Sequence, residues 1–316
     1  MTIVLSGTAG PRGWPEPGCA CASCLALPAG HRRPAGLLVD GRPVSPGSYA
    51  AGGLRVLYEP GCGREADAAG PYDLVVLDVA GRPERLGELR RAGLAGAGTR
   101  VVGVGFDHRV RSEEELGRRL ALWGALAVPD GTVLDDVAGS PMPRPRRALL
   151  LGGSRSGKSA EAELRLAAEP YVTYVATGPS GDGDGEWAAR VRAHRERRPA
   201  HWETEETTDL AGVLARARTP LLVDGLGTWL AAVFDEHGAW EGPGEPVWRR
   251  CEELVAAWRR APQEVVAVSD EVGLGVVPAT ASGRAFRDAL GRLNQRLAAE
   301  SEYVALVVAG RLTPLG

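Results

Sequence analysis

Short apolar runs alternate with longer segments of helical periodicity in the second half of the chain. Apolar runs of strand length predict strands at residues 148–151, 171–176, 220–224, 264–269 and 303–309. Helical patterns predict helices from residue 158 as far as 169 and at 185–197, 228–236, 245–260 and 282–300. Such alternation is typical of an α/β fold, a mostly parallel sheet with helices on both faces.

The first 137 residues show a less regular alternation, with glycine-rich loops between the apolar runs. Strands are expected at residues 3–5, 37–40, 55–57, 74–79 and 101–104. Residues 138–146 follow, with three prolines in five positions and no periodicity, which favours extended backbone. We therefore predict a smaller α/β domain at 1–137, a linker at 138–146 and a second domain at 147–316.

The composition is that of an ordinary globular chain. Its 316 residues are 44% hydrophobic and 24% charged, with a net charge of −3. No dense basic stripe is joined to aromatic residues, which argues against a nucleic acid as the main partner. No apolar run approaches the roughly 18 residues of a membrane span, and the first residues do not resemble a signal peptide. We expect a cytoplasmic protein that does not insert into membranes.

A phosphate-binding loop follows the apolar run at 148–151. It matches the pattern G-x-x-x-x-G-K-[ST], and it opens a predicted helix whose N-terminus would also face the phosphates. Lys158 is expected to contact the β- and γ-phosphates and Ser159 to hold Mg²⁺, while backbone N–H groups surround the phosphate oxygens. The predicted nucleotide-binding residues here are Gly152, Gly153, Ser154, Arg155, Ser156, Gly157, Lys158 and Ser159.

Lys158 is the only lysine in the chain, although lysine and arginine together number 37. Position 158 therefore keeps lysine although the coding bias favours arginine elsewhere in the chain. A compact ammonium fits between two phosphates, whereas a planar guanidinium does not enter the loop. The position thus requires lysine.

Two further residues are candidates on chemical grounds. Asp224 ends the apolar run from Pro220, where a carboxylate can orient Mg²⁺ or its water or act as a base, although a solvated strand-end aspartate is the alternative. His194 lies on the predicted helix 185–197, beside arginines at 192, 195, 197 and 198 that would attract a polyphosphate. A lone surface histidine is more often inert.

Several separated motifs of the second half occur in the order of a known enzyme family. They are residues 152–159, 188–194, 198–202, 269–278 and 286–297. With them, residues 147–316 resemble the bifunctional adenosylcobinamide kinase/adenosylcobinamide-phosphate guanylyltransferases of cobalamin synthesis. The resemblance implies a P-loop NTPase-type fold, the nucleotides GTP and ATP with Mg²⁺, the substrates adenosylcobinamide and adenosylcobinamide phosphate, and a homotrimer.

The resemblance also implies roles for single residues. His194 would become covalently guanylylated, and Asp224 would contact the metal or guanine. Further nucleotide contacts would come from Ala176, Thr177, Gly178, Arg195, Glu196, Arg197, Arg198 and Glu206. The chain departs from the family after Asp224, where it reads Gly-Leu-Gly-Thr-Trp and its two glycines predict a looser turn.

Two functions follow. In the implied one, adenosylcobinamide is phosphorylated by ATP or GTP, and GMP then passes from GTP through a guanylyl-histidine to give adenosylcobinamide-GDP. In the alternative, the chain is a P-loop kinase for another small alcohol, with His194 idle and the first domain serving as a docking or oligomerisation module.

Three cysteines, Cys19, Cys21 and Cys24, lie within six residues of a loop rich in proline and glycine. Three soft ligands so close together suit zinc, which needs a fourth, although small buried or reactive cysteines would show the same pattern. The chain's five cysteines are too few and too unevenly placed for a disulfide framework.

The first domain resembles phosphodiesterase-like members of the metallo-β-lactamase superfamily at its two ends. The likeness rests on residues 7–10, the C-x-C-x-x-C, residues 31–34, 105–108, 113–122 and 128–131. The superfamily's H-x-H-x-D-H cluster is missing, so the resemblance implies a catalytically dead remnant. It also implies a structural zinc on Cys19, Cys21, Cys24 and His108, with Cys62 as a substitute fourth ligand.

Overall fold

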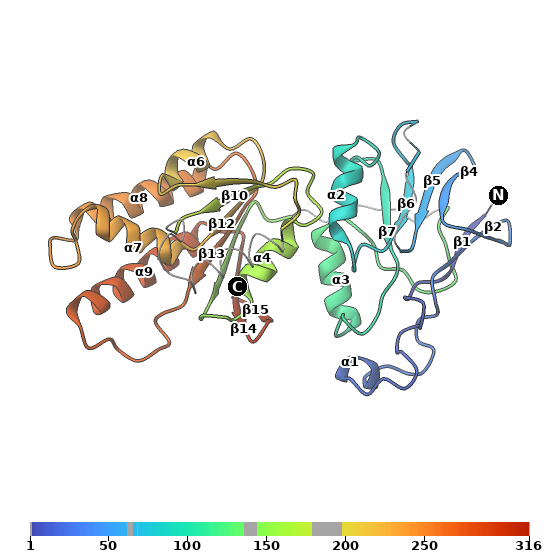
Figure 1. Cartoon of the computed structure of the whole chain (residues 1–316), viewed down its shortest axis with the longest axis horizontal. Helices are drawn as coiled ribbons and strands as arrows, with labels where there is room; N and C mark the ends of the chain where they lie inside the picture. Colours follow the sequence, from blue (N-terminus) through green and yellow to red (C-terminus); the bar gives the residue numbers. More distant parts are fainter. Residues whose placement is uncertain (1, 62–65, 68, 136–143, 179–197, 316) are drawn as a thin grey trace. The chain divides into compact units, whose positions relative to one another are not determined.

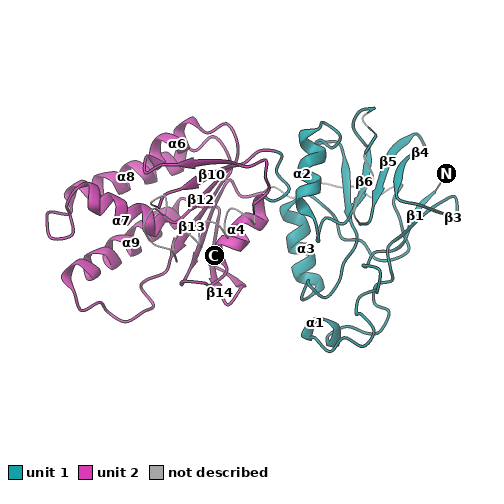
Figure 2. Cartoon of the chain, viewed as in Figure 1, with its two compact units in different colours: residues 1–143, 167–170 teal, residues 144–166, 171–316 magenta. Residues whose placement is uncertain are grey.

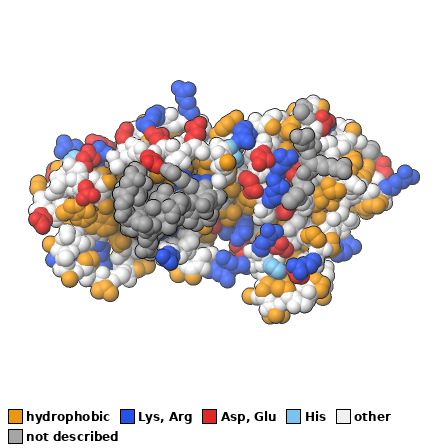
Figure 3. Space-filling model, in the orientation of Figure 1, with side chains coloured by type: hydrophobic (Ala, Val, Ile, Leu, Met, Phe, Trp, Pro, Cys, Tyr) orange, Lys and Arg blue, Asp and Glu red, His pale blue; other side chains and the backbone are white. Residues whose placement is uncertain are grey.

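The computed structural model describes residues 2–61, 66–67, 69–135, 144–178 and 198–315 (Figure 1). The chain divides into two compact units, one of residues 1–143 with 167–170 and one of residues 144–166 with 171–316 (Figure 2). Most of the predicted linker lies outside the described residues. Side chains of both charges are interspersed over the face of each unit in Figure 3. In the described part of the chain, no helix is both long and apolar enough to cross a membrane.

Unit 2 is built on a seven-stranded sheet, in the order β11-β10-β12-β13-β9-β14-β15. All neighbouring strands are parallel except β14 and β15, which are antiparallel. The strands are β9 (Arg147–Gly152), β10 (Thr173–Ala176), β11 (Glu203–Glu206), β12 (Leu221–Asp224), β13 (Val265–Asp270), β14 (Tyr303–Val308) and β15 (Arg311–Pro314). The predicted, mostly parallel sheet is therefore confirmed.

Helices cover both faces of this sheet, because alternate residues of each strand point to opposite sides. Leu149 and Leu151 of β9 join the core under α6 (Leu210–Arg216), α7 (Leu226–Glu236), α8 (Glu245–Arg260) and α9 (Ala281–Ala299). Ala148 and Leu150 join the opposite core, which contains Ala162 and Leu166 of α4 (Lys158–Leu166). Buried strands of this kind read as continuous apolar runs.

Helix boundaries follow local chemistry. Helix α8 spans the predicted residues and has proline in its first turn, where a missing N–H costs nothing. The Thr280 side chain accepts a hydrogen bond from the Gly283 N–H and so caps α9. Helix α4 ends at Leu166, three residues before the predicted end at Glu169. Pro170 disfavours helical backbone at Glu169, the last residue of the predicted helix.

The expected elements of unit 2 omitted β11, α6 and β15. Strand β11 reads Glu-Thr-Glu-Glu at the edge of the sheet, so it carries no apolar signal. Strand β15 follows β14 through a two-residue turn at Ala309 and Gly310, whose φ angles are 49° and 68°. Positive φ at both positions is the type I′ geometry that matches the twist of a hairpin.

Unit 1 contains two four-stranded sheets. The first, in the order β3-β2-β1-β8, consists of β1 (Ile3–Gly7), β2 (Gly36–Val39), β3 (Arg42–Val44) and β8 (Thr132–Val133). The second, in the order β4-β5-β6-β7, consists of β4 (Gly47–Ala51), β5 (Leu54–Glu59), β6 (Leu74–Leu77) and β7 (Arg100–Gly103). The two sheets share one core. Ile3 and Leu5 of β1 belong to it, together with Leu74 and Val76 of β6 and Val102 of β7, so the sheets form a sandwich.

Helices α2 (Pro83–Arg91) and α3 (Glu113–Leu122) accompany the second sheet of unit 1, whereas α1 (Ala22–Leu25) is a single turn. Leu120 of α3 is packed so closely on β7 that a Cβ at Gly103 would lie 3.1 Å from its methyl groups. Strands β3, β4 and β8 were not predicted, because they are short and partly polar. Two signals for hairpins were nevertheless present, since Asp40-Gly41 and Gly52-Gly53 form two-residue turns with positive φ throughout.

Candidate functional site

The site of unit 2 lies at the carboxyl ends of the parallel strands. Strand register places Asp270, the last residue of β13, beside Gly152, the last residue of β9. On the other side of β13, Ala176 of β10 is the register partner of both Glu206 and Asp224. Ligands of open α/β sheets bind at this edge.

The phosphate-binding loop has a conformation that requires glycine at two positions, Gly152 and Gly157. Gly157 has a φ of +97°, and a Cβ there would lie 3.2 Å from Gly310 Cα. A Cβ at Gly152 would lie 2.6 Å from both Ser156 Oγ and Val307 O. The Gly310 N–H donates to Ser156 O at 2.7 Å, so the unpredicted β14-β15 hairpin supports the loop from outside.

Lys158 is held at the mouth of this loop. Its Nζ lies 3.0 Å from Gly153 O and 2.8 Å from Asp270 Oδ1. The compact ammonium is thus fixed beside the loop backbone by an acid from the neighbouring strand. Asp270 is not among the site residues predicted from the sequence. Like Asp224, it is an acid at the end of an apolar strand, so the same pattern could have identified it.

Ser159 and Asp224 form a second polar pair. Ser159 Oγ donates to Asp224 Oδ1 at 3.1 Å, and Tyr174 OH donates to Asp224 Oδ2. Burial, followed by the nearby Asp224 charge, raises the pKa of Tyr174. The Tyr174 hydroxyl therefore stays protonated and acts as a donor that orients the carboxylate. The Arg198 guanidinium lies over the Tyr174 ring, with Cζ 3.4 Å from the centroid.

The turn after Asp224 is closely packed rather than loose, contrary to the expectation from its two glycines. Thr177 Oγ1 donates to Gly225 O at 2.7 Å, and Thr228 Oγ1 reaches the same oxygen at 2.7 Å. Gly225 has a φ of +109°, and a Cβ at Gly227 would lie 2.7 Å from Asp270 Oδ2. The glycines are needed because a side chain would strain the backbone at Gly225 or collide with Asp270 at Gly227.

The other predicted nucleotide contacts are distributed around this edge. Gly153, Ser154 and Arg155 are exposed, whereas Ser156 is buried. Ala176 and Gly178 are half-buried after β10, and Glu206 is exposed at the end of β11. His194, Arg195, Glu196 and Arg197 lie outside the described residues.

Residues 148–315 match the family described as cobinamide kinase / cobinamide phosphate guanyltransferase. The chain belongs to this family. The match includes the phosphate-binding loop, Asp224 and Asp270, and it leaves out residues 1–147.

Three relatives align over the same half of the chain. The bifunctional adenosylcobalamin biosynthesis protein CobU of Salmonella typhimurium is 39% identical over 174 residues, which are 51% of this chain and 95% of that protein. CobU of Escherichia coli is 38% identical over 174 residues, again 51% of this chain and 95% of that protein. CobP of Pseudomonas aeruginosa is 44% identical over 54% of this chain and 96% of its own. Nearly the whole of each relative aligns with about half of this chain, so the residues before the match lie outside the aligned part.

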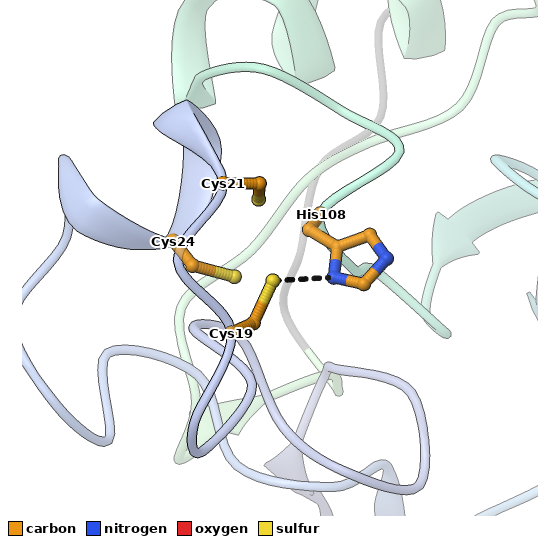
Figure 4. Close-up of side chains that lie close together, drawn as sticks. All are labelled: Cys19, Cys21, Cys24 and His108. Carbon is orange, nitrogen blue, oxygen red and sulfur yellow. Dashed lines mark hydrogen bonds between the residues drawn. The ribbon is translucent and has the colours of Figure 1, made fainter.

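A second cluster of reactive side chains lies in unit 1, outside the family match. Figure 4 shows the side chains of Cys19, Cys21, Cys24 and His108 converging from the loop around α1 and the segment after β7. One ligand atom from each lies within 4.8 Å of all the others, and Cys19 Sγ is 3.5 Å from His108 Nδ1. The other predicted ligand, Cys62, lies outside the described residues.

The donor set of this cluster fits zinc. Tetrahedral coordination with Zn–S bonds of about 2.3 Å places sulfur atoms roughly 3.8 Å apart, within the spacing found here. Burial raises the pKa of the Cys24 thiol to about 11, and the Glu16 N–H lies 3.4 Å from its sulfur. The Cys24 N–H lowers the pKa of Cys21. At neutral pH Cys24 keeps its proton unless a cation replaces it.

Replacing Gly157 by alanine is expected to destabilise the fold by about 1–3 kcal/mol, because alanine is strained at this φ and its Cβ approaches Gly310. The measurement is urea-induced unfolding without nucleotide. Gly153→Ala is the matched control, since a Cβ at Gly153 has no atom within 4 Å. Equal free energies of unfolding for the two variants would contradict the strained geometry of the loop.

Proposed function

We propose that this chain catalyses two successive reactions, phosphorylation of adenosylcobinamide and transfer of GMP to the resulting phosphate. The observation that carries the proposal is the polar edge of the family-matched sheet, where Lys158 meets Asp270 and Ser159 meets Asp224. This arrangement provides a cation for phosphate oxygens and oxygen donors for a metal ion in neighbouring positions.

In the kinase step, the hydroxyl oxygen of the aminopropanol arm attacks the γ-phosphorus of ATP or GTP. The bond from that phosphorus to the β–γ bridging oxygen breaks, the nucleoside diphosphate leaves, and the hydroxyl proton passes to a base or to water. Such transfer needs mainly positioning and charge stabilisation. Lys158 would turn from Asp270 towards the β- and γ-phosphates, while the loop N–H groups of Gly153, Ser156 and Gly157 bind their oxygens.

Mg²⁺ would bind at Ser159 and Asp224, whose facing oxygens are 3.1 Å apart. When bound, the ion neutralises charge on the phosphate oxygens. Tyr174 contributes by holding the second carboxylate oxygen of Asp224, so that the first faces Ser159. Hard oxygen donors of this kind are the ones that Mg²⁺ prefers.

In the second step, an imidazole nitrogen of His194 attacks the α-phosphorus of GTP, and pyrophosphate leaves. A phosphate oxygen of adenosylcobinamide phosphate then attacks the phosphorus of the guanylyl-histidine. The P–N bond breaks, adenosylcobinamide-GDP forms, and the histidine is restored. The role of His194 rests on the family resemblance.

We assign the remaining predicted contacts by chemistry. Thr177 and its neighbours Ala176 and Gly178 follow β10, where hydroxyl and backbone groups can bind the nucleotide. Arg195, Arg197 and Arg198 would neutralise phosphate charge. The exposed carboxylate of Glu206, with Glu196, would accept hydrogen bonds from guanine or ribose.

We propose further that unit 1 holds a structural zinc ion on Cys19, Cys21, Cys24 and His108. Four protein ligands close the coordination shell, as in structural rather than catalytic zinc sites. The ion would tie the loop around α1 to the segment that precedes α3, so it would stabilise this unit without taking part in either transfer. In this proposal, residues 1–137 are a domain added to a catalytic domain of residues 147–316.

Wild-type protein incubated with GTP labelled at the α-phosphate is expected to retain label after denaturation, because the guanylyl group is covalently bound. The label should be lost in acid and kept in alkali, as a phosphoramidate requires. His194→Ala should abolish labelling, whereas His237→Ala, at the exposed end of α7, should not. Absence of label on the wild-type protein would favour a kinase with a single activity.

Lys158→Arg is expected to lower the rate of adenosylcobinamide phosphorylation by roughly 10²- to 10³-fold, the scale for loss of one group that stabilises transition-state charge. The ammonium nitrogen lies 3.0 Å from Gly153 O and 2.8 Å from Asp270 Oδ1, and a planar guanidinium does not reproduce this compact point charge. Guanylylation of His194 should fall less. Product formation from each reaction measures the effect, and retention of both activities would refute the requirement for an ammonium.

Purified protein is expected to contain about one zinc ion per chain, and Cys21→Ser should lose it, because three ligands bind zinc much more weakly than four. Metal content by mass spectrometry is the measurement. Cys251→Ala is the matched control, since this buried thiol belongs to the core of unit 2. Equal and negligible zinc in wild-type protein and Cys21→Ser would exclude the site.

A further inference from the structure

A buried asparagine interrupts the apolar face of α9. Leu290, Leu293 and Leu297 of this helix are at most 1% exposed and belong to the core of unit 2. Asn294 falls on the same face by helical spacing and is 4% exposed. Asparagine is a weak helix former, and burying its amide is unfavourable unless the amide is hydrogen-bonded. Hydrogen bonds therefore have to account for asparagine at this position.

Both halves of the Asn294 amide are hydrogen-bonded to the end of β13. Ser269 Oγ donates to Asn294 Oδ1 at 2.6 Å, and Asn294 Nδ2 donates to Asp270 O at 3.1 Å. Strand β12 pairs with β13 only as far as Val268, whose register partner is Asp224. Beyond the end of β12, a side chain from α9 thus holds the last two residues of β13.

The peptide group between Asp270 and Glu271 connects α9 to the phosphate-binding loop. Its C=O accepts the hydrogen bond from Asn294, and its N–H donates to Gly152 O at 3.2 Å. Because a peptide group is planar, a bond that fixes the direction of the C=O also fixes the direction of the N–H. Asn294 therefore orients the N–H that holds the first residue of the loop. Beyond this peptide group, the β13–α9 segment comprises residues 271–280.

The same stretch of backbone carries the carboxylate that pairs with Lys158. Asp270 Oδ1 lies 2.8 Å from Lys158 Nζ, and the lysine side chain is 12% exposed in this pair. A single methylene joins the carboxylate of aspartate to its backbone, so the direction of the backbone largely decides where the carboxylate lies. Rotation at the end of β13 would open the ion pair, and the bond from Asn294 opposes such rotation.

Packing alone does not explain the asparagine. A leucine at position 294 would continue the apolar face of α9 and fill the core as its neighbours do. It would supply no N–H for Asp270 O, so the end of β13 would lose its bond to α9. Residues 286–297 are also one of the motifs that the chain shares with its family, and none of the predicted site residues lies in them.

We propose that Asn294 is a positioning residue for both transfers. From the core under α9, it orients the peptide group after Asp270, and through this group it positions Gly152 and the Lys158 ammonium for the phosphates. The inference rests on the proposed function, because it takes the phosphate-binding loop as the site of both reactions. Asn294 is too deeply buried to contact a nucleotide, so it acts only through Asp270.

The test uses two variants of the full-length protein, Asn294→Leu and Asn294→Ala, which remove the same donor but change the side-chain volume in opposite directions. Lys158 is the only lysine of the chain, so acetylation of lysine by an amine-reactive reagent reports on this residue alone. The acetylation rate is measured by peptide mass spectrometry without nucleotide. Asp270→Ala gives the rate for a lysine that has lost its carboxylate partner.

The second measurement is the affinity for a GTP analogue with a methylene group between the α- and β-phosphorus atoms, which cannot guanylylate the protein. Equilibrium dialysis gives this affinity without any corrinoid. Ser301→Ala is the matched control. Ser301 Oγ accepts from Trp258 Nε1 at 3.1 Å and donates to Leu297 O at 2.7 Å, so this change removes two hydrogen bonds at the other end of α9. Circular dichroism establishes that each variant is folded.

Both Asn294 variants are expected to be acetylated faster at Lys158, towards the rate of Asp270→Ala. They should bind the GTP analogue roughly three- to tenfold more weakly, the effect of losing one hydrogen bond. Ser301→Ala should match the wild type in both measurements.

Folded Asn294 variants with the acetylation rate and the affinity of the wild type would overturn the inference. Effects of equal size in Ser301→Ala would also overturn it, because any lost hydrogen bond around α9 would then suffice. Wild-type protein that does not bind the GTP analogue would instead refute the proposed function. The acetylation rates are measured without nucleotide, so they test the action of Asn294 on Lys158 in either case.

Discussion

The parallel register of β9, β12 and β13 is the constraint on which the nucleotide site depends. Because parallel strands all end at the same edge, Gly152, Asp224 and Asp270 arrive together although they come from three separate parts of the chain. A shift of one residue in β12 or β13 would turn its terminal acid towards the other face of the sheet. The apolar alternation that builds the two cores therefore also fixes the direction of the acids.

The phosphate-binding loop depends on residues far from it in sequence. Gly310 of the β14–β15 turn donates to Ser156 O, and Asp270 holds Lys158. A glycine-rich loop has high backbone entropy, so these contacts reduce the cost of ordering it around phosphates. The β13–α9 segment, bonded to Gly152 through Glu271, belongs to the same assembly.

In unit 1, the core between the two sheets and the cysteine-bearing loop differ in how they are held. Its two sheets share one core, but the loop that carries Cys19, Cys21 and Cys24 has only the single turn of α1 as regular structure. The cysteines nevertheless lie together with His108, which is more than 80 positions away in the chain. A metal ion bound there would add ligand bonds between this loop and the segment that carries His108.

The sequence by itself determined the elements with a strong local pattern and the residues with a demanding chemistry. Helix α8, the buried strands β9 and β13, the phosphate-binding loop and Lys158 were all predictable, because apolar periodicity and the loop motif are local. Only the tertiary structure decided what depends on contacts between distant segments. It paired Asp270 with Lys158, used Tyr174 to orient Asp224, and placed the polar strand β11 at the sheet edge. It also showed that Gly225 and Gly227 pack tightly instead of loosening their turn. These outcomes could not be predicted because a strand's neighbours are chosen by the packing of the whole sheet, and no short stretch of sequence encodes them.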